Sequence, residues 1–425
     1  MSRGVAYVLV ISFLLLTALG FVMLLSTSPY SQEGQLDSFT GVRRQGLWLL
    51  LGLVAAGLLS ATDYHRLEAA VSPLFWAAIV LLALCFINGI GVKVGGASRW
   101  ISLRIPGLGA FTGQPSELAK LTTVIALAAW CARYRERREE FFFGFALPLL
   151  VVALPVALIA VEVDLGTASL IFLVSTAMLY IAGTRTVYIL GLILIGAGLL
   201  AGAIHLIPNR TARITAFLHL NDPAEVAEVA GSVGAVEEGT VLAKLADYLH
   251  LKANAADPKL SSEIKDMNLQ QTQAMIALGS GGLTGQGLGE SRQKMYYLPL
   301  PHTDSVFAIV GEEGGLVATL VVIMLFLLGG LSGVVIALQA PDRFGKLLGF
   351  GLMALILGQA AINMAVTTGC LPNKGMPLPF ISYGGSNLFS CMLALGIVLN
   401  IHRQAREAAA VPVALLQRQK LTPSL

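Results

Sequence analysis

The chain has 425 residues, of which 56% are hydrophobic and only 12% are charged, and its mean hydropathy is +0.75. Soluble domains carry about 25% charged residues, so this composition excludes an ordinary soluble domain and predicts a protein that crosses a membrane several times. The net charge of +3 is too small to indicate a nucleic-acid partner. We therefore expect membrane lipids, and no nucleic acid, around most of its surface.

Ten apolar stretches along the chain predict an all-α polytopic membrane protein, since a helix needs about 20 residues to cross a bilayer. The first stretch has no small-residue cleavage site after it, so we expect it to stay as the first helix. A long polar loop, 208–303, follows the seventh span. The predicted spans are 5–26, 45–62, 71–90, 115–132, 143–161, 166–183, 186–207, 304–338, 344–370 and 384–402.

These spans predict one membrane domain over residues 1–405 and a cytoplasmic tail over 406–425. Positive residues in short loops favour the cytoplasmic side of a membrane. With both termini cytoplasmic, thirteen lysines and arginines fall on that side and six in the short outer loops. The loop 208–303 is then extracytoplasmic. Within it, the segment at about 222–266 could form two helices and either contact a partner or membrane surface or be a neutral insertion.

Asp304 lies where this polar loop meets the eighth span. A charged group near bilayer depth is expensive and indicates function, and a carboxylate at the boundary can stay ionised and still reach a lipid-anchored molecule. The alternative is that Asp304 only caps the helix that follows, since Asp is a favoured N-cap. The span itself is overlong, so we expect its beginning, with Glu312 and Glu313, at the outer surface or facing a cavity.

Polar residues cluster before and within the fourth span. Arg99 is a bidentate phosphate donor beside Trp100, an aromatic suited to the headgroup level. Ser116 is a candidate N-cap for the helix, with Pro115 fixing its entry. Glu117 and Lys120 are three residues apart on one face and can pair. Such a pair inside a span predicts a cavity or a binding site.

A second cluster, Glu162 and Asp164, occupies a tight turn between two spans. The two carboxylates could hold a cation, could receive Lys120, or could be ordinary turn residues. A third cluster is the glycine-rich string 279–289, whose backbone amides could form an anion-binding concavity, with Lys294 after it. It lacks the GK[ST] ending of a P-loop.

A fourth cluster, 371–386, is rich in proline and glycine and cannot be a helix. Non-helical backbone at membrane depth is tolerated only inside protein or beside water, so we expect a loop or re-entrant element that borders a cavity.

Together the strings GGASRWI, QPSELAK, DLGTA, ALGSGGLTGQGLG, QKMYYLPLPHTDSVFAIVGEEGG and LPNKGMPLPFISYGGSN resemble the SEDS (shape, elongation, division and sporulation) family over about residues 5–405. PNKG is more similar to the division branch, FtsW, than to the elongation branch, RodA. The chain departs from the family pattern at Glu162, Val163, Ser305 and Asn387, and in the longer loop at 222–266.

The resemblance implies a peptidoglycan glycosyltransferase of the bacterial inner membrane that polymerises lipid II, an undecaprenyl-linked precursor, for septal wall synthesis in cell division. We expect inversion at the sugar, by direct displacement. The resemblance also implies Asp304 as the essential carboxylate and general base, and a class B penicillin-binding protein and other divisome proteins as partners. Arg99, Lys120 and Lys294, or a divalent cation (Mg²⁺ or Mn²⁺) near Asp304 or Asp164, could neutralise the leaving pyrophosphate. The candidate substrate-binding residues are Arg99, Trp100, Gln114, Ser116, Glu117, Lys120, Asp164, Lys294, His302, Lys374 and Ser382.

Three alternatives stay open. An elongation polymerase of the RodA type would use the same chemistry. A transporter that flips lipid II would explain ten spans and an intramembrane Lys/Glu pair, although such proteins often carry internal repeats, which we do not find here. A scaffold for other division proteins would leave the intramembrane charges unexplained.

Overall fold

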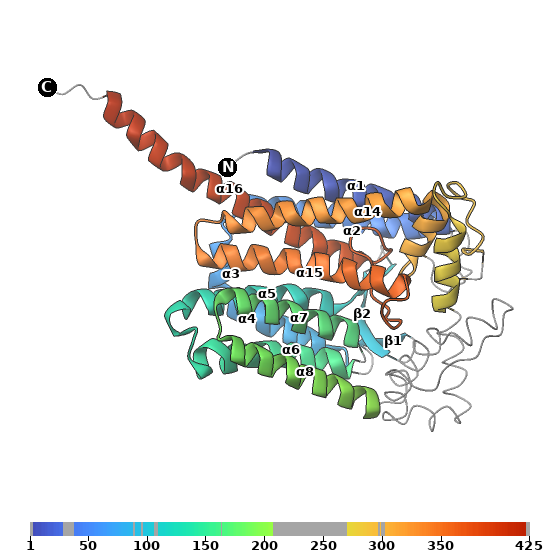
Figure 1. Ribbon diagram of the computed structural model, residues 1–425, viewed down its shortest axis with the longest axis horizontal. Helices are drawn as coiled ribbons and strands as arrows, with labels where there is room; N and C mark the ends of the chain where they lie inside the picture. The colour runs from blue at the N-terminus through green and yellow to red at the C-terminus, as the bar shows by residue number, and fades with distance from the viewer. Residues whose placement is uncertain are drawn as a thin grey trace, which may run out of the picture.

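The computed structural model describes residues 3–28, 38–87, 90–94, 97–105, 109–162, 164–206, 270–295, 298 and 302–421. In this part of the chain long helices lie side by side with their axes nearly aligned (Figure 1). The predicted helices at 222–266 lie outside the described residues. The helices are α1 (Arg3–Thr27), α2 (Ser38–Ala61), α3 (His65–Ala69), α4 (Val71–Leu84), α5 (Pro115–Arg133), α6 (Leu147–Val161), α7 (Leu165–Ala182), α8 (Thr186–Leu206), α14 (Val306–Leu338), α15 (Arg343–Thr367) and α16 (Gly385–Leu421).

Seven helices among the described residues are long and apolar enough to cross a membrane, which agrees with an integral membrane protein. They are α1, α2 from Thr40, α6 with the π-helical turn η3 (Phe142–Ala146) before it, α7, α14, α15 and α16 to Ala410. The apolar stretches of α4 and α8, Val71–Leu84 and Thr186–Gly198, are shorter. The count of ten spans therefore stays a prediction. α16 continues as a helix through the segment expected to be a separate tail.

A three-stranded antiparallel sheet between α4 and α5 is a difference from the predicted all-α fold. Its strands, β1 (Gly91–Val94), β2 (Ala97–Ile105) and β3 (Gly109–Gly113), lie in the order β1-β2-β3, with Val92 opposite Trp100 and Leu103 opposite Phe111. Valine, isoleucine, tryptophan and phenylalanine favour strands, and frequent glycines disfavour a helix here. The sequence pattern predicts only a polar loop for this segment.

Close helix contacts hold the bundle together. α2 packs along α16, α1 along α14, and α5 against α4 and α15. Small residues allow the closest approach, as is common between membrane helices. A Cβ on Gly396 of α16 would come within 2.6 Å of the carbonyl oxygen of Ala56 on α2. Large apolar side chains on the outer helix faces, such as Val187 and Leu194, stay exposed, as expected of a lipid-facing surface.

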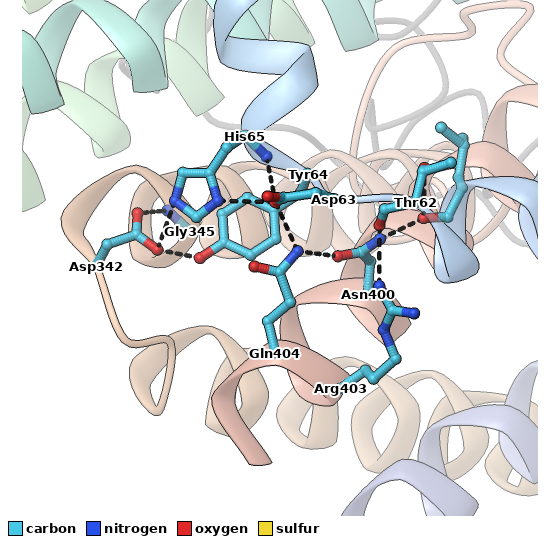
Figure 2. A network of polar contacts seen from close by, with 10 residues as sticks. Thr62, Asp63, Tyr64, His65, Asp342, Gly345, Asn400, Arg403 and Gln404 are labelled. Carbon is cyan, nitrogen blue, oxygen red and sulfur yellow. Dashed lines mark hydrogen bonds and ion pairs between the residues drawn. The ribbon is translucent and has the colours of Figure 1, made fainter. Parts of the chain in front are cut away.

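A polar network closes one end of the bundle (Figure 2). Asp342 caps α15 by accepting a hydrogen bond from the backbone N–H of Gly345 at 2.8 Å, and it also accepts one from the Tyr64 hydroxyl. Asp63 accepts a hydrogen bond from the Gln404 side chain of α16 at 2.7 Å. The backbone N–H of His65 and the Gln404 amide lower the pKa of Asp63 to about 2. The network joins the α2–α3 turn, the α14–α15 turn and α16.

Candidate functional site

Asp304 lies just before α14, at the end of the bundle opposite the network of Figure 2. Ser305, not Asp304, is the N-cap of α14, and no side chain caps the helix. The capping alternative is therefore not supported. The Asp304 carboxylate is half-buried and faces the backbone of Gly375, where a Cβ would come within 2.8 Å of Oδ2. A glycine at position 375 leaves room for the carboxylate.

A small pocket opens beside Asp304. It brings together Asp304 and Lys374, two of the predicted site residues that are 70 positions apart in the sequence. A carboxylate and an ammonium group thus line one space between the start of α14 and the loop that follows α15. The pocket is lined by Gln270, Gln271, Ala274, Asp304, Ser305, Val366, Thr367, Asn373 and Lys374.

The backbone of residues 302–304 is fixed by three hydrogen bonds. The side-chain amide of Asn363 donates to the carbonyl oxygen of Asp304 at 2.9 Å. The Ser382 hydroxyl donates to the carbonyl oxygen of Thr303 at 2.6 Å, and the Tyr383 N–H to that of His302 at 2.9 Å. Ser382 is buried, and His302 packs edge-on against Tyr383. These contacts hold Asp304 in place, so Ser382 supports the site through the backbone.

The loop at 368–384 is non-helical, as the sequence predicts, and packs into the bundle rather than lying on its surface. Phe380 adopts a positive φ of 65° and stacks on Phe13 of α1, with ring centroids 4.6 Å apart. A Cβ on Gly20 would come within 2.7 Å of the carbonyl oxygens of Phe380 and Ile381. The loop is therefore a fixed wall of the pocket beside Asp304.

A buried polar chain runs from α5 to this loop. Lys120 pairs with Glu117, with Nζ 2.8 Å from Oε2, and also donates to Oε1 of Gln359 at 2.7 Å. The Gln359 amide donates in turn to the carbonyl oxygen of Pro377 at 2.8 Å. The predicted Lys120–Glu117 pair is confirmed, and Lys120 pairs with Glu117 rather than with Asp164. Each charge is compensated, as a buried ion pair requires.

Asp164 caps α7, accepting hydrogen bonds from the backbone N–H of Thr167 at 3.1 Å and from its hydroxyl at 2.9 Å. The side chain of Gln114 donates to the same carboxylate at 3.3 Å. Gln114, not Ser116, is the N-cap residue of α5, with Pro115 at the first helical position as expected. The N-cap expectation for Ser116 is wrong because Pro115 already fixes the start of the helix, and Ser116 lies buried within it.

Glu162 is a buried carboxylate beside these groups. Arg99 of β2 donates to its backbone carbonyl oxygen at 3.2 Å, so β2 is fixed to the α6–α7 turn, while Trp100 stays half-buried in β2. Neither carboxylate oxygen of Glu162 forms a hydrogen bond within the described part of the chain. Burial, together with repulsion from Asp164, raises the pKa of Glu162 to about 8. The protonated form of Glu162 is therefore favoured more strongly than in an exposed glutamate.

Lys294 lies in a buried ion pair with Glu313, with Nζ 2.7 Å from Oε1, and not in the lining of the pocket beside Asp304. Ser26 of α1 donates to the same carboxylate oxygen at 2.6 Å. Glu312 accepts hydrogen bonds from the Ser291 hydroxyl and from the backbone N–H of Arg292. The surface position expected for Glu312 and Glu313 is wrong, because both are buried and bonded to the preceding segment.

Two backbone amides of the glycine-rich string have partners within the protein. The amides of Gln286 and Gly287 donate to the carbonyl oxygens of Glu312 and Glu313, at 2.9 and 3.0 Å. α14 is kinked at Gly315, whose φ is 67° and ψ −166°. The string supplies partners for backbone groups that the kink removes from the helix. The anion-binding expectation is therefore wrong for these amides.

Two residues of α15 that the sequence analysis missed, Gln359 and Asn363, connect the polar groups. They are four residues apart and so lie on one helix face. Both are buried polar residues in an apolar span, which is a signal that could have revealed them. Among the described residues, no group of three or more His, Cys, Asp and Glu side chains comes together where it could hold a metal ion.

A family model described as "Cell cycle protein" (FTSW_RODA_SPOVE) matches residues 6–252 and 244–407. The chain belongs to the FtsW/RodA/SpoVE family. It is 35% identical over 411 residues to a protein of Geobacter sp. (strain M18) named "Probable peptidoglycan glycosyltransferase FtsW", covering 96% of this chain and 99% of that one. It is 34% identical to "Stage V sporulation protein E" of Bacillus subtilis (strain 168), covering 94% and 97%.

Solved structures of this family share the fold. One, described as "Structural coordination of polymerization and crosslinking by a peptidoglycan synthase complex", superposes with a TM-score of 0.62 at 25% identity, covering 93% of this chain and 97% of that chain. The rod shape determining protein RodA of Thermus thermophilus superposes with a TM-score of 0.59 at 26% identity, covering 93% and 96%. The FtsW/RodA/SpoVE fold therefore extends over nearly the whole chain.

Proposed function

We propose that this protein is a peptidoglycan glycosyltransferase that polymerises lipid II into glycan strands, with septal wall synthesis as its setting. The observation that carries the proposal is the position of Asp304, a half-buried carboxylate just before the start of α14 and beside Lys374, where three hydrogen bonds fix the backbone carbonyl oxygens of residues 302–304. The family relatives named peptidoglycan glycosyltransferase support the substrate and the reaction.

The reaction joins an acceptor sugar hydroxyl to the anomeric carbon of a second lipid-linked sugar. Asp304 takes the proton of the hydroxyl as the new C–O bond forms. The bond from the anomeric carbon to the polyprenyl pyrophosphate breaks, and the pyrophosphate leaves with the bonding electrons. Lys374 is the cation in the same pocket and stabilises the negative charge on the leaving group. Direct displacement inverts the configuration, so a covalent sugar–Asp304 adduct would contradict it.

The pocket lies on the extracytoplasmic side in this proposal, with both termini cytoplasmic. A class B penicillin-binding protein is the proposed partner, and the likeness of this chain to a member of a peptidoglycan synthase complex supports it. A divalent cation at Asp304 or Asp164 stays a prediction, and no step above depends on it.

The test is polymerisation of purified lipid II by the full chain with its cognate penicillin-binding protein, whose transpeptidase is blocked. Wild type should make long strands, and Asp304→Asn should make none while keeping the wild-type melting temperature. Glu136→Gln, an isosteric change of an exposed carboxylate at the other end of the bundle, should retain activity. Strands of wild-type length and yield from a folded Asp304→Asn protein would overturn the assignment.

A second candidate, a lipid II transporter, is favoured by the Lys120–Glu117 pair buried within the bundle. Charged pairs of this kind mark transport pathways in many membrane proteins. A translocation assay with lipid II in proteoliposomes distinguishes the two functions. Movement of lipid II that depends on Lys120 but not on Asp304, without polymerisation, would favour transport.

A further inference from the structure

Three arginines converge at the end of the bundle opposite Asp304. Arg135 lies in the short 3-10 helix η2 (Arg135–Arg137) after α5, Arg138 follows it, and Arg343 opens α15. The Arg138 side chain lies over Gly183, where a Cβ would come within 3.0 Å of its Cδ and 3.2 Å of its Nε. Arg343 donates from Nη2 to the carbonyl oxygen of Ala182. Both therefore contact the C-terminal end of α7.

The turns that carry these arginines lie at one end of the bundle, where α5 leads into α6, α7 into α8 and α14 into α15 (Figure 1). Arg138 and Arg343 lie against the adjacent residues Gly183 and Ala182, and Arg135 belongs to the turn that directly precedes Arg138. We refer to Arg135, Arg138 and Arg343 as the arginine cluster. It combines residues that are about 200 positions apart in the sequence.

Two of the nearby carboxylates, Glu139 and Glu140, are paired with other arginines, while Asp342 bonds Tyr64 and Gly345 and Glu136 is exposed in η2. Glu140 binds Arg137, with Oε2 2.7 Å from Nη2, and the Arg137 guanidinium also stacks over the ring of Phe143. Glu139 lies 3.8 Å from Arg185. Within the described residues, no carboxylate comes within ion-pair distance of the arginine cluster, and the buried Nε of Arg343 has no hydrogen-bond partner. The positive charge of the cluster is therefore uncompensated there.

The partial negative charge at the C-terminus of α7 can compensate only part of the positive charge of the arginine cluster. A helix C-terminus carries about half a negative charge, which favours one nearby cation. The hydrogen bond from Arg343 to Ala182 satisfies that requirement. Arg135 and Arg138 add two exposed guanidinium groups at the same end, and an anion bound between them would reduce their mutual repulsion. Guanidinium groups bind phosphate oxygens in a bidentate manner, so a phosphate is the anion that fits their chemistry.

The surroundings of the arginine cluster are those of a membrane interface. Phe141 and Phe142 are 48% and 66% exposed, directly after the turn that carries Arg135 and Arg138. Trp130 donates from its indole N–H to the carbonyl oxygen of Phe143 at 3.0 Å. Aromatic side chains beside arginines are typical of the headgroup level of a bilayer. A phosphate bound there belongs to a lipid.

We propose that Arg135, Arg138 and Arg343 bind the phosphate of an anionic phospholipid headgroup at the end of the bundle opposite Asp304. The lipid bridges the turn after α5 and the start of α15. The bound phosphate compensates the cluster, so anionic lipid stabilises the packing of α5, α7 and α15 at this end.

The test uses the full chain in a neutral detergent, with palmitoyl-oleoyl phosphatidylglycerol, palmitoyl-oleoyl phosphatidylcholine or inorganic phosphate added. Native mass spectrometry counts retained lipid, and thermal denaturation measures the shift in melting temperature. Arg135→Gln/Arg138→Gln removes two charges of the cluster and leaves the hydrogen bond of Arg343 intact. The matched control, Arg137→Gln/Arg185→Gln, removes two arginines from the same end that are paired with glutamates.

We expect wild type and control to retain phosphatidylglycerol in preference to phosphatidylcholine and to gain melting temperature from it. The cluster variant should bind it at least tenfold more weakly. If both double variants lose phosphatidylglycerol binding equally, binding depends on the general positive charge of this end of the bundle. That result would contradict a specific site at the arginine cluster. Equal retention of both lipids, or the same stabilisation by inorganic phosphate, would overturn the assignment to an anionic lipid.

Discussion

The side-chain amide of Asn363 donates one hydrogen bond to the backbone carbonyl oxygen of Asp304 at 2.9 Å and another to that of Met376 at 2.7 Å. Two segments that meet at the pocket, the start of α14 and the loop after α15, are thus held by one buried side chain. Asn363 is 2% exposed, so no water replaces it easily.

Replacing Asn363 with leucine should therefore reduce lipid II polymerisation while leaving the Asp304 carboxyl group in the protein. The backbone at Asp304 loses its anchor, and misplacement of a catalytic group by about 1 Å can cost on the order of 100-fold in rate. The measurement is the initial rate of strand formation at saturating lipid II.

Thr17→Val is a control for this experiment, since the Thr17 hydroxyl bonds only within α1, to the Phe13 carbonyl oxygen at 2.8 Å. It should keep nearly full activity. Wild-type rates from a folded Asn363→Leu protein would show that the anchor is not needed.

Lys294→Met should destabilise the protein strongly without a direct effect on the pocket beside Asp304. Removing one member of a buried ion pair leaves the other charge uncompensated, which costs about 3–5 kcal/mol. The double variant Lys294→Met/Glu313→Gln should recover part of that loss. Thermal denaturation in detergent measures both, and a Lys294→Met protein as stable as wild type would contradict the structural assignment of this lysine.

Gly315→Ala should disrupt the kink in α14. Its φ of 67° with ψ of −166° lies in a region open almost only to glycine, at a cost of about 1–3 kcal/mol for other residues. A Cβ there would also come within 2.4 Å of the backbone nitrogen of Gly285. Gly57→Ala in α2, where a Cβ meets nothing within 4 Å, should be neutral or stabilising. Equal melting temperatures for the two variants would argue against the kink.

Glu162 should make stability fall as the pH rises. Its pKa in the folded protein is raised from 4.5 to about 8, so the folded state binds the proton more tightly than the unfolded state. Stability is thus lost between pH 4.5 and about 8 and is constant outside that range for this group. Glu162→Gln should match wild type near pH 4.5 and exceed it at about pH 9. If the melting temperatures of wild type and Glu162→Gln change with pH in the same way across this range, the pKa of Glu162 is not raised.

Much of the helical framework could be predicted from the sequence, because an apolar run of about 20 residues is the length that a helix needs to cross a bilayer. The turn between α6 and α7, the loop after α15 and the Lys120–Glu117 pair follow from short-range spacing. Asp304 stood out because a carboxylate is rare at the edge of an apolar span. In each case the residues that indicate the structure lie within a few positions of it in the sequence.

Long-range pairing could not be predicted in the same way. Lys294 and Glu313 are 19 residues apart, and nothing in the sequence between them indicates that they form an ion pair. The glycines at 281–287 resemble an anion nest because the sequence does not show that Glu312 and Glu313 offer carbonyl oxygens to that string. The sheet was missed because polar and glycine residues interrupt its strand pattern.

Met376 and Pro377 are adjacent in the chain, and their carbonyl oxygens receive hydrogen bonds from Asn363 and Gln359 respectively. A unit of two consecutive peptide groups, Met376–Pro377 and Pro377–Leu378, therefore ties the pocket at Asp304 to the buried charges on α5. A shift of this unit alters both places together, so the effects of substitutions at Gln359 and Asn363 on free energy will not be additive. The coupling free energy between Gln359 and Asn363 therefore measures how strongly the buried Lys120–Glu117 pair is linked to the pocket beside Asp304.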